Sequence, residues 1–225
     1  PQVYKIFGPG NRYVTTAKTM VQNHVAIDMP AGPSEVLVVA DETANPSFVA
    51  ADLLAQAEHG TDSQAILVST SYNIIEKTLV EIENQLSILP RKEIATQAIE
   101  NSYAVLVENL DFAMDFSNEY APEHLILATE NFESLIPLII NAGSVFLGNL
   151  TPESAGDYAS GTNHTLPTSG FAKAYSGVST DAFLKKITFQ HLTTNGLNNI
   201  GPTVETLAAA EGLQAHKNAI TIRLK

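Results

Sequence analysis

The stretch Glu-Val-Leu-Val-Val-Ala at residues 35–40 decides the fold, because it is a short apolar run of the kind that forms a buried strand. A segment with apolar positions at helical spacing follows at residues 46–59, and a second strand-like run comes at residues 65–69. Strands that alternate with helices of this length indicate parallel strands joined by crossover helices. The stretch therefore predicts an α/β fold.

The same alternation continues towards the C-terminus. Further helices are predicted at residues 74–89, 92–101, 112–120 and 132–141, and further strands at 103–107, 124–128 and 144–147. From residue 149 to 178 the pattern is lost in favour of Gly, Ser, Thr and Pro, and long loops of this kind are usually functional. A short strand at 186–190, a helix at 204–211 and a basic segment complete the prediction.

Composition excludes several classes of protein. The 225 residues carry a net charge of −12 and a pI of about 4.8, which argues against a nucleic-acid or anionic-membrane partner. The chain has no Cys, so it forms no disulfide and no thiolate metal site. Cysteine usage therefore does not decide the compartment, although a reducing cytoplasm fits and is the one expected. No apolar run approaches the length of a transmembrane helix.

Glu123 and His124 stand side by side after Pro122, where an apolar run begins. Charged residues at the mouth of a buried strand are costly unless they are paired or functional. Adjacent side chains of a regular strand point to opposite faces, so both reach one pocket only where the backbone is irregular, which Pro122 favours. On its own, the pair fits the simpler interpretation of a solvated strand start better than that of an acid–base pair.

Gln56 and His59 close the first predicted helix and share one of its faces. An imidazole nitrogen and an amide oxygen are possible metal ligands, but a His in the last helical turn often serves only the helix dipole. Asp157 and His164 lie in the irregular, glycine-rich stretch 153–164, which is either a ligand-binding loop or a polar surface loop.

Two turns near the N-terminus carry further candidates. Residues 7–11, Phe-Gly-Pro-Gly-Asn, join a predicted strand to a helix, where glycines permit close approach of an anionic ligand. The full GxGxxG spacing is absent, so a plain turn remains an equal alternative. Ser34 could present its hydroxyl to a ligand, although satisfying turn backbone groups is the simpler role for both Ser34 and Asp28.

Glu211 and His216 lie near the C-terminus and can share a face only if Gly212 supplies a turn between them; a tail helix with a solvated His is the simpler interpretation. Taken together, the chain offers a set of possible ligands beside glycines or at element ends: Gln56, His59, His124, Asp157, His164 and His216. Zinc accepts His nitrogen and Asp oxygen, and the absence of Cys favours a catalytic over a structural zinc site.

Several stretches are specific in combination: FGPGN (7–11), DMPAGPSE (28–35), DLLAQAEHG (52–60), YAPEHL (120–125), NAGSVFLG (141–148), PESAGDYASGTNHTLPT (152–168) and ETLAAAEGLQAHKNA (205–219). Together they closely resemble the histidinol dehydrogenase family, from end to end of the chain. Members of that family are nearly twice as long, so the resemblance implies the C-terminal half or slightly more, without most of the NAD-binding domain.

The resemblance implies an incomplete Rossmann-like parallel sheet flanked by helices, followed by a mostly helical tail. It assigns residues 1–37 to the end of the NAD-binding domain and residues 38–178 to the main substrate and zinc domain. Residues 179–225 become a tail domain exchanged between the subunits of a homodimer.

The resemblance also implies roles for single residues. Zinc ligands are Gln56, His59, Asp157 and, across the dimer interface, His216; substrate-positioning groups are Ser34, His164 and Glu211, beside His124 and the zinc ligands; the cofactor contact is Asn11; the acid–base pair is Glu123 and His124.

The implied reaction oxidises L-histidinol through L-histidinal to L-histidine with NAD and one Zn²⁺ per subunit, although the isolated chain is expected to bind NAD poorly. Two competing interpretations remain open. One is a non-catalytic zinc- or imidazole-binding module that lacks the NAD site. The other is a zinc hydrolase in which Glu123 is the general base.

Overall fold

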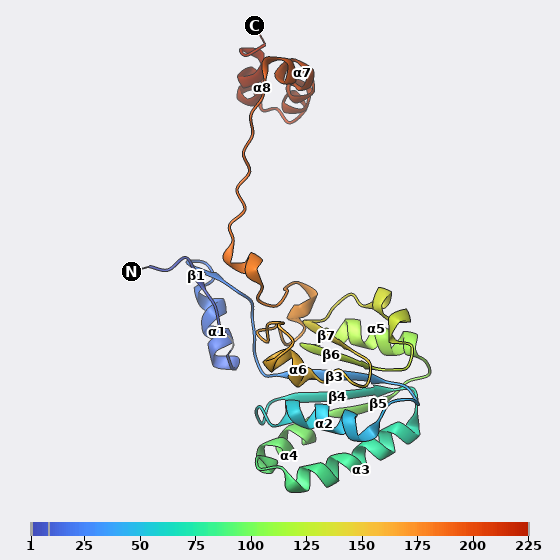
Figure 1. Ribbon diagram of the computed structural model, residues 1–225. Coiled ribbons are helices and arrows are strands. Elements are labelled where there is room, and N and C mark those ends of the chain that lie inside the picture. Colours follow the sequence, from blue (N-terminus) through green and yellow to red (C-terminus); the bar gives the residue numbers. More distant parts are fainter. Residues whose placement is uncertain (1, 9, 225) are drawn as a thin grey trace. The chain divides into compact units, whose positions relative to one another are not determined.

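Five parallel strands form the main sheet in the order β5-β4-β3-β6-β7 (Figure 1). Their bounds are β3 (Glu35–Ala40), β4 (Gln64–Ser69), β5 (Tyr103–Leu106), β6 (His124–Ala128) and β7 (Ser144–Leu147). The computed structural model describes residues 2–8 and 10–224, and the chain divides into two units between Phe183 and Leu184. The parallel sheet with flanking helices and a helical C-terminal part confirms the predicted fold class.

Helices cover both faces of this sheet, which is why its central strands are apolar throughout. On one face lie α2 (Pro46–Ala57), α3 (Tyr72–Ile88) and α4 (Lys92–Glu100), and on the other lies α5 (Leu110–Tyr120) (Figure 1). Val36 and Val38 of β3 pack with α2 and α3, whereas Leu37 and Val39 pack with α5. Every residue of β3 and β6 is buried, so the pairing of these two strands forms the centre of the core.

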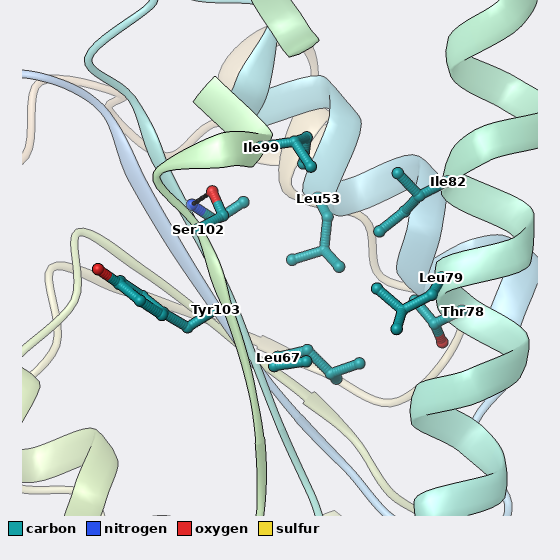
Figure 2. Close-up of a pocket in the computed structure, with 10 residues that line it drawn as sticks. Leu53, Leu67, Thr78, Leu79, Ile82, Ile99, Ser102 and Tyr103 are labelled. Carbon is teal, nitrogen blue, oxygen red and sulfur yellow. Dashed lines mark hydrogen bonds between the residues drawn. The ribbon is translucent and has the colours of Figure 1, made fainter. Parts of the chain in front are cut away.

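A small apolar cavity of about 70 Å³ lies between α3, α4 and the sheet. Figure 2 shows Leu53, Leu67, Leu79 and Ile82 around it, with Tyr103 at one side. Its lining contains no carboxylate and no imidazole. It therefore belongs to the packing of helices on the sheet.

A smaller two-stranded parallel sheet precedes the main one, formed by β1 (Lys5–Ile6) and β2 (Ala26–Ile27). Helix α1 (Arg12–Val21) connects its strands, and the Asn11 side chain caps this helix by accepting hydrogen bonds from two backbone N–H groups. The described residues 7, 8, 10 and 11 thus lie between a strand and a helix, as the sequence predicts, while residue 9 of the predicted turn lies outside the described residues.

Two predicted elements in the first unit differ from the structure. Residues 132–141 form two short 3₁₀ helices, η1 (Phe132–Ser134) and η2 (Ile136–Leu138), because Pro137 has no amide hydrogen and disfavours an α-helical residue before it. The stretch after residue 149 is not wholly irregular. It contains α6 (Glu153–Tyr158), η3 (Phe171–Lys173) and η4 (Thr180–Phe183).

The second unit consists of α7 (Thr194–Ala210) and α8 (Gln214–Thr221). Helix α7 begins well before the predicted residue 204, because Thr193 caps it at the Gly196 N–H. The strand predicted at 186–190 is wrong, because those residues form no helix or strand. Gly212, at φ +72°, supplies the turn between the two helices.

In the described part of the chain, no helix has the length and apolar character required to cross a membrane.

Gly143, just before β7, lies close to the backbone of Glu123, just before β6. A Cβ atom at this position would stand 2.5 Å from the backbone oxygen of Glu123. We expect Gly143→Ala to lower the free energy of unfolding of the first unit by about 1–3 kcal/mol, the usual cost of overpacking. Urea unfolding followed by tyrosine fluorescence measures this, because all seven Tyr residues lie in the first unit.

The matched control is Gly196→Ala in the first turn of α7, where the nearest atom to an added Cβ is 3.4 Å away. This change should leave the tyrosine-detected transition where it is. An equal, negligible effect of both substitutions would contradict the described packing around Gly143.

Candidate active site

A cavity of about 290 Å³ in the first unit contains most of the predicted site residues. It is lined by Gly10, Ala31, Gly32, Ser34, Gln56, His59, Glu123, His124, Glu153, Asp157, His164 and Leu166. Ser34 directly precedes β3 and His124 opens β6, so the cavity lies at the amino ends of the central strands. Gln56 and His59 come from the C-terminal end of α2, where the negative pole of the helix dipole favours a cation.

The backbone of Glu35 holds the adjacent acid and base. Its N–H donates to the Glu123 Oε2 atom at 2.9 Å, and its carbonyl oxygen lies 3.2 Å from His124 Nδ1. Because a carbonyl oxygen only accepts, Nδ1 carries the proton and Nε2 keeps its lone pair. The Nε2 atom is buried, has no hydrogen-bond partner among the residues that the structure describes, and lies 3.9 Å from Asp157 Oδ1.

An irregular backbone brings Glu123 and His124 to the same cavity. Ala121 adopts a left-handed conformation at φ 56°, and β6 begins only at His124, so Glu123 lies outside the regular strand. The Glu123 Oε2 atom is 3.6 Å from His124 Nδ1. The irregularity that the sequence required for a shared pocket is therefore present.

Burial controls the protonation of this cavity. Desolvation, together with the nearby carboxyl groups of Glu35, Glu153 and Asp157, raises the pKa of Glu123 to about 9, although the hydrogen bond from the Glu35 N–H works to lower it. Desolvation also raises the pKa of Glu153 to about 8 and lowers the pKa of His124 to about 4. Without a cation, Glu123 and Glu153 hold protons at neutral pH and His124 is neutral. A cation among them would favour their ionised forms.

Three side chains offer donor atoms that lie within 4.8 Å of one another: His59, Glu153 and Asp157. Glu153 and Asp157 are four residues apart on α6 and share one of its faces. With its nitrogen turned to Glu153, the buried Gln56 amide donates to both carboxylate oxygens at 2.7 Å. Its oxygen then lies 2.9 Å from the Glu35 nitrogen, so Gln56 and Glu123 share the one Glu35 N–H as acceptors. One imidazole and several oxygen donors around a desolvated space fit a zinc ion.

Glu153 is the site residue that the sequence analysis missed. It was assigned only to a polar stretch, because a helix of six residues is too short to show helical periodicity. The available signal was its spacing of four from Asp157 directly after Pro152, which places both carboxylates on one face if a helix begins there.

The remaining predicted residues fall in three places. Ser34 and His164 line the cavity. Asn11 lines an adjoining hollow of about 210 Å³ that shares Gly10, Gly32, Ser34 and His59 with the cavity. Glu211 caps α7 and His216 lies in α8; both are exposed and belong to the second unit, so their roles stay predictions.

Comparisons with known proteins agree over the whole chain. The family model described as histidinol dehydrogenase matches residues 1–224. Histidinol dehydrogenase of Bacteroides thetaiotaomicron is 63% identical over 225 residues, which are 100% of this chain and 53% of that protein. The chloroplastic histidinol dehydrogenase of Arabidopsis thaliana is 58% identical over 232 aligned residues, covering 100% of this chain and 49% of that protein.

A solved structure shows the same agreement. The crystal structure of histidinol dehydrogenase from Elizabethkingia anophelis matches with a TM-score of 0.96 and 63% identity, covering 100% of this chain and 52% of that one. The chain thus spans about half the length of the relatives that it matches.

The raised pKa of Glu123 generates a prediction for the metal-free chain. A carboxyl group whose pKa is higher in the folded state stabilises the fold at low pH, and this contribution is lost as pH rises from about 4.5 towards 9. We expect urea unfolding in the presence of a chelator to show stability falling over this range. Glu123→Gln should reduce the slope by up to one proton, about 1.4 kcal/mol per pH unit.

The exposed Glu76→Gln, on α3, is the control and should leave the slope as it is. A Glu123→Gln profile parallel to that of the parent chain would contradict a buried, protonated Glu123.

Proposed function

This chain belongs to the histidinol dehydrogenase family, and on that basis we propose that it carries the substrate and metal site of a zinc- and NAD-dependent enzyme. The proposed reaction oxidises L-histidinol to L-histidinal and then to L-histidine, using two NAD⁺ and one water. The observation that best supports it is the buried, unpartnered Nε2 atom of His124 beside a group of metal donors. Such an atom is available to accept a proton from bound substrate.

His124 is the proposed base for the first oxidation. Its Nε2 atom accepts the proton of the substrate hydroxyl while a hydride leaves the carbinol carbon for NAD⁺. The Glu35 carbonyl, which accepts from Nδ1–H, keeps the ring in the tautomer that this step requires and stabilises the imidazolium that forms. A positioned base of this kind contributes about 10²–10⁴-fold to the rate.

Glu123 is the proposed base for the second oxidation, in which water adds to the aldehyde. Its carboxylate accepts one proton from the attacking water, and His124, after releasing its first proton, accepts the hydroxyl proton of the hydrated aldehyde as the second hydride leaves for NAD⁺. This role requires an ionised Glu123, whereas its pKa of about 9 describes a cavity without a cation. The positive charge of a bound metal would lower that pKa towards neutrality.

Zinc would be held by Gln56, His59 and Asp157, with His216 of the partner subunit as the fourth protein ligand of a homodimer. Bound zinc would orient the imidazole and amine of the substrate. Ser34, His164 and Glu211 would position the substrate, and Glu153 supports the site by accepting from the Gln56 amide. Asn11 would contact NAD through its amide nitrogen, because its oxygen is used to cap α1.

One assay distinguishes this function from its alternatives. Zinc content and NADH formation from L-histidinol are measured on this chain and on a longer version that spans the full length of its relatives. Zinc in both, with NADH only from the longer chain, supports the proposal. Zinc with hydrolysis of an amide and no NADH would replace it by the hydrolase. Zinc without either activity in the longer chain would leave a binding module.

His124→Asn tests the proposed base in the longer chain. Asparagine is close in size but has no basic nitrogen, so turnover of L-histidinol should fall about 10²–10⁴-fold. Zinc content should match the parent, because His124 is not among the proposed ligands. Steady-state kinetics and elemental analysis of the same preparation measure both.

His24→Asn makes the same chemical change at an exposed position and should not alter turnover. Parent-like turnover in His124→Asn would show that another group accepts the hydroxyl proton.

A further inference from the structure

A buried ion pair lies outside the cavity, between Lys18 of α1 and Asp28, directly after β2. Their side chains are 5% and 0% exposed. Lys18 Nζ donates to the Gly8 carbonyl oxygen at 2.9 Å, and Gly8 N–H donates to Asp28 Oδ2 at 2.8 Å. The pair therefore holds both backbone polar groups of Gly8.

The contacts of Asp28 stabilise its ionised form. Burial works to raise the pKa of this carboxyl group, but hydrogen bonds from Lys18, Gly8 and the Met29 N–H, with the charge of Lys18, outweigh burial and hold the pKa below its ordinary value. A buried ion pair seldom stabilises a fold more than apolar side chains of similar volume would. This pair also fixes the local geometry, because Lys18 Nζ bonds both Asp28 and the Gly8 carbonyl while the Asp28 carboxylate accepts from the N–H groups of Gly8 and Met29.

Gly8 lies close in sequence to residues that line the hollow. It lies two and three positions before Gly10 and Asn11, which line the hollow beside the cavity. Gly10 lines the cavity as well. Asp28 begins the segment that ends at Ser34, which also lines both spaces. The ion pair thus joins the two turns that border the hollow, although neither of its members lines it.

We propose that Lys18 and Asp28 are positioning residues for the dinucleotide cofactor. By fixing Gly8 they hold Gly10 and Asn11 at the rim of the hollow, so that the amide of Asn11 meets the cofactor without a further ordering cost. This inference rests on the proposed function, in which Asn11 contacts NAD. It concerns the affinity for the cofactor and leaves the zinc site and the proton transfers unchanged.

The test uses Lys18→Met and Asp28→Asn in the longer chain. Each substitution should raise the KM for NAD⁺ about tenfold or more, in line with the effect of misplacing a binding group. The kcat at saturating NAD⁺, the KM for L-histidinol and the zinc content should stay close to those of the parent. General loosening of the fold would change all four quantities together.

Two control variants accompany this test. Lys173→Met removes an ion pair with Glu119 on the surface and should leave the KM for NAD⁺ unchanged. Asn11→Ser keeps an oxygen to cap α1 and removes the amide donor, so it should raise the KM for NAD⁺. If Asn11→Ser has no effect, the cofactor role proposed for Asn11 is wrong.

Parent-like KM values for NAD⁺ in Lys18→Met and Asp28→Asn would overturn the inference, whatever Asn11→Ser shows. A single variant leaves one buried charge without its partner and can fail to fold. In that case the double variant Lys18→Met/Asp28→Asn, which removes both charges, is measured in its place. Hydrogen exchange then reports on Gly8, whose amide should be protected in the parent and exposed in the double variant. Loss of this protection with no rise in the KM for NAD⁺ would also overturn the inference.

Discussion

The site depends on the backbone of Glu35. Its N–H donates to Glu123 and its carbonyl accepts from His124, so one peptide segment determines where the acid lies and which nitrogen of the base is free. These bonds form because β3 and β6 pair with Val36 opposite His124. Both strands are buried on both faces, so a slip of one residue would exchange the two core faces and turn His124 away. The packing of the core therefore determines the position of Glu123 and the tautomer of His124.

The location of the cavity follows from charge. In open α/β sheets, ligands usually bind at the carboxyl ends of strands where the strand order reverses, near helix N-termini that favour anions. Here the order reverses between β3 and β6, but the cavity lies at their amino ends. Helix C-termini point to this edge, and α2 brings Gln56 and His59 with its negative pole. Buried carboxyl groups add to a field that suits a cation.

The sequence predicted those parts of the molecule that repeat a local pattern. The strands of the main sheet and helices α2 to α5 follow their periodicity, whereas β2 was not predicted and α7 was predicted to begin at 204 instead of Thr194. The irregular backbone that Pro122 favours before His124 is present, with Ala121 in the left-handed conformation. Glu153 was missed because α6 has only six residues, and residues 132–141 were misassigned because Pro137 interrupts an otherwise helical pattern. The contacts of Glu35 join residues that are 88 and 89 positions apart, which no local pattern can indicate. The strand predicted at 186–190 had the pattern, but these residues belong to neither described sheet.

The tautomer of His124 decides whether its Nε2 atom is free to act as the proposed base. Nitrogen-15 NMR of the imidazole side chains at pH 7, with the His124 signals assigned by their loss in His124→Asn, distinguishes the two neutral forms from the imidazolium. A neutral ring protonated at Nδ1, with a bare Nε2, is the result that the Glu35 carbonyl requires. A ring protonated at Nε2, or a charged imidazolium, would contradict the proposed base and its origin in the pairing of β3 with β6.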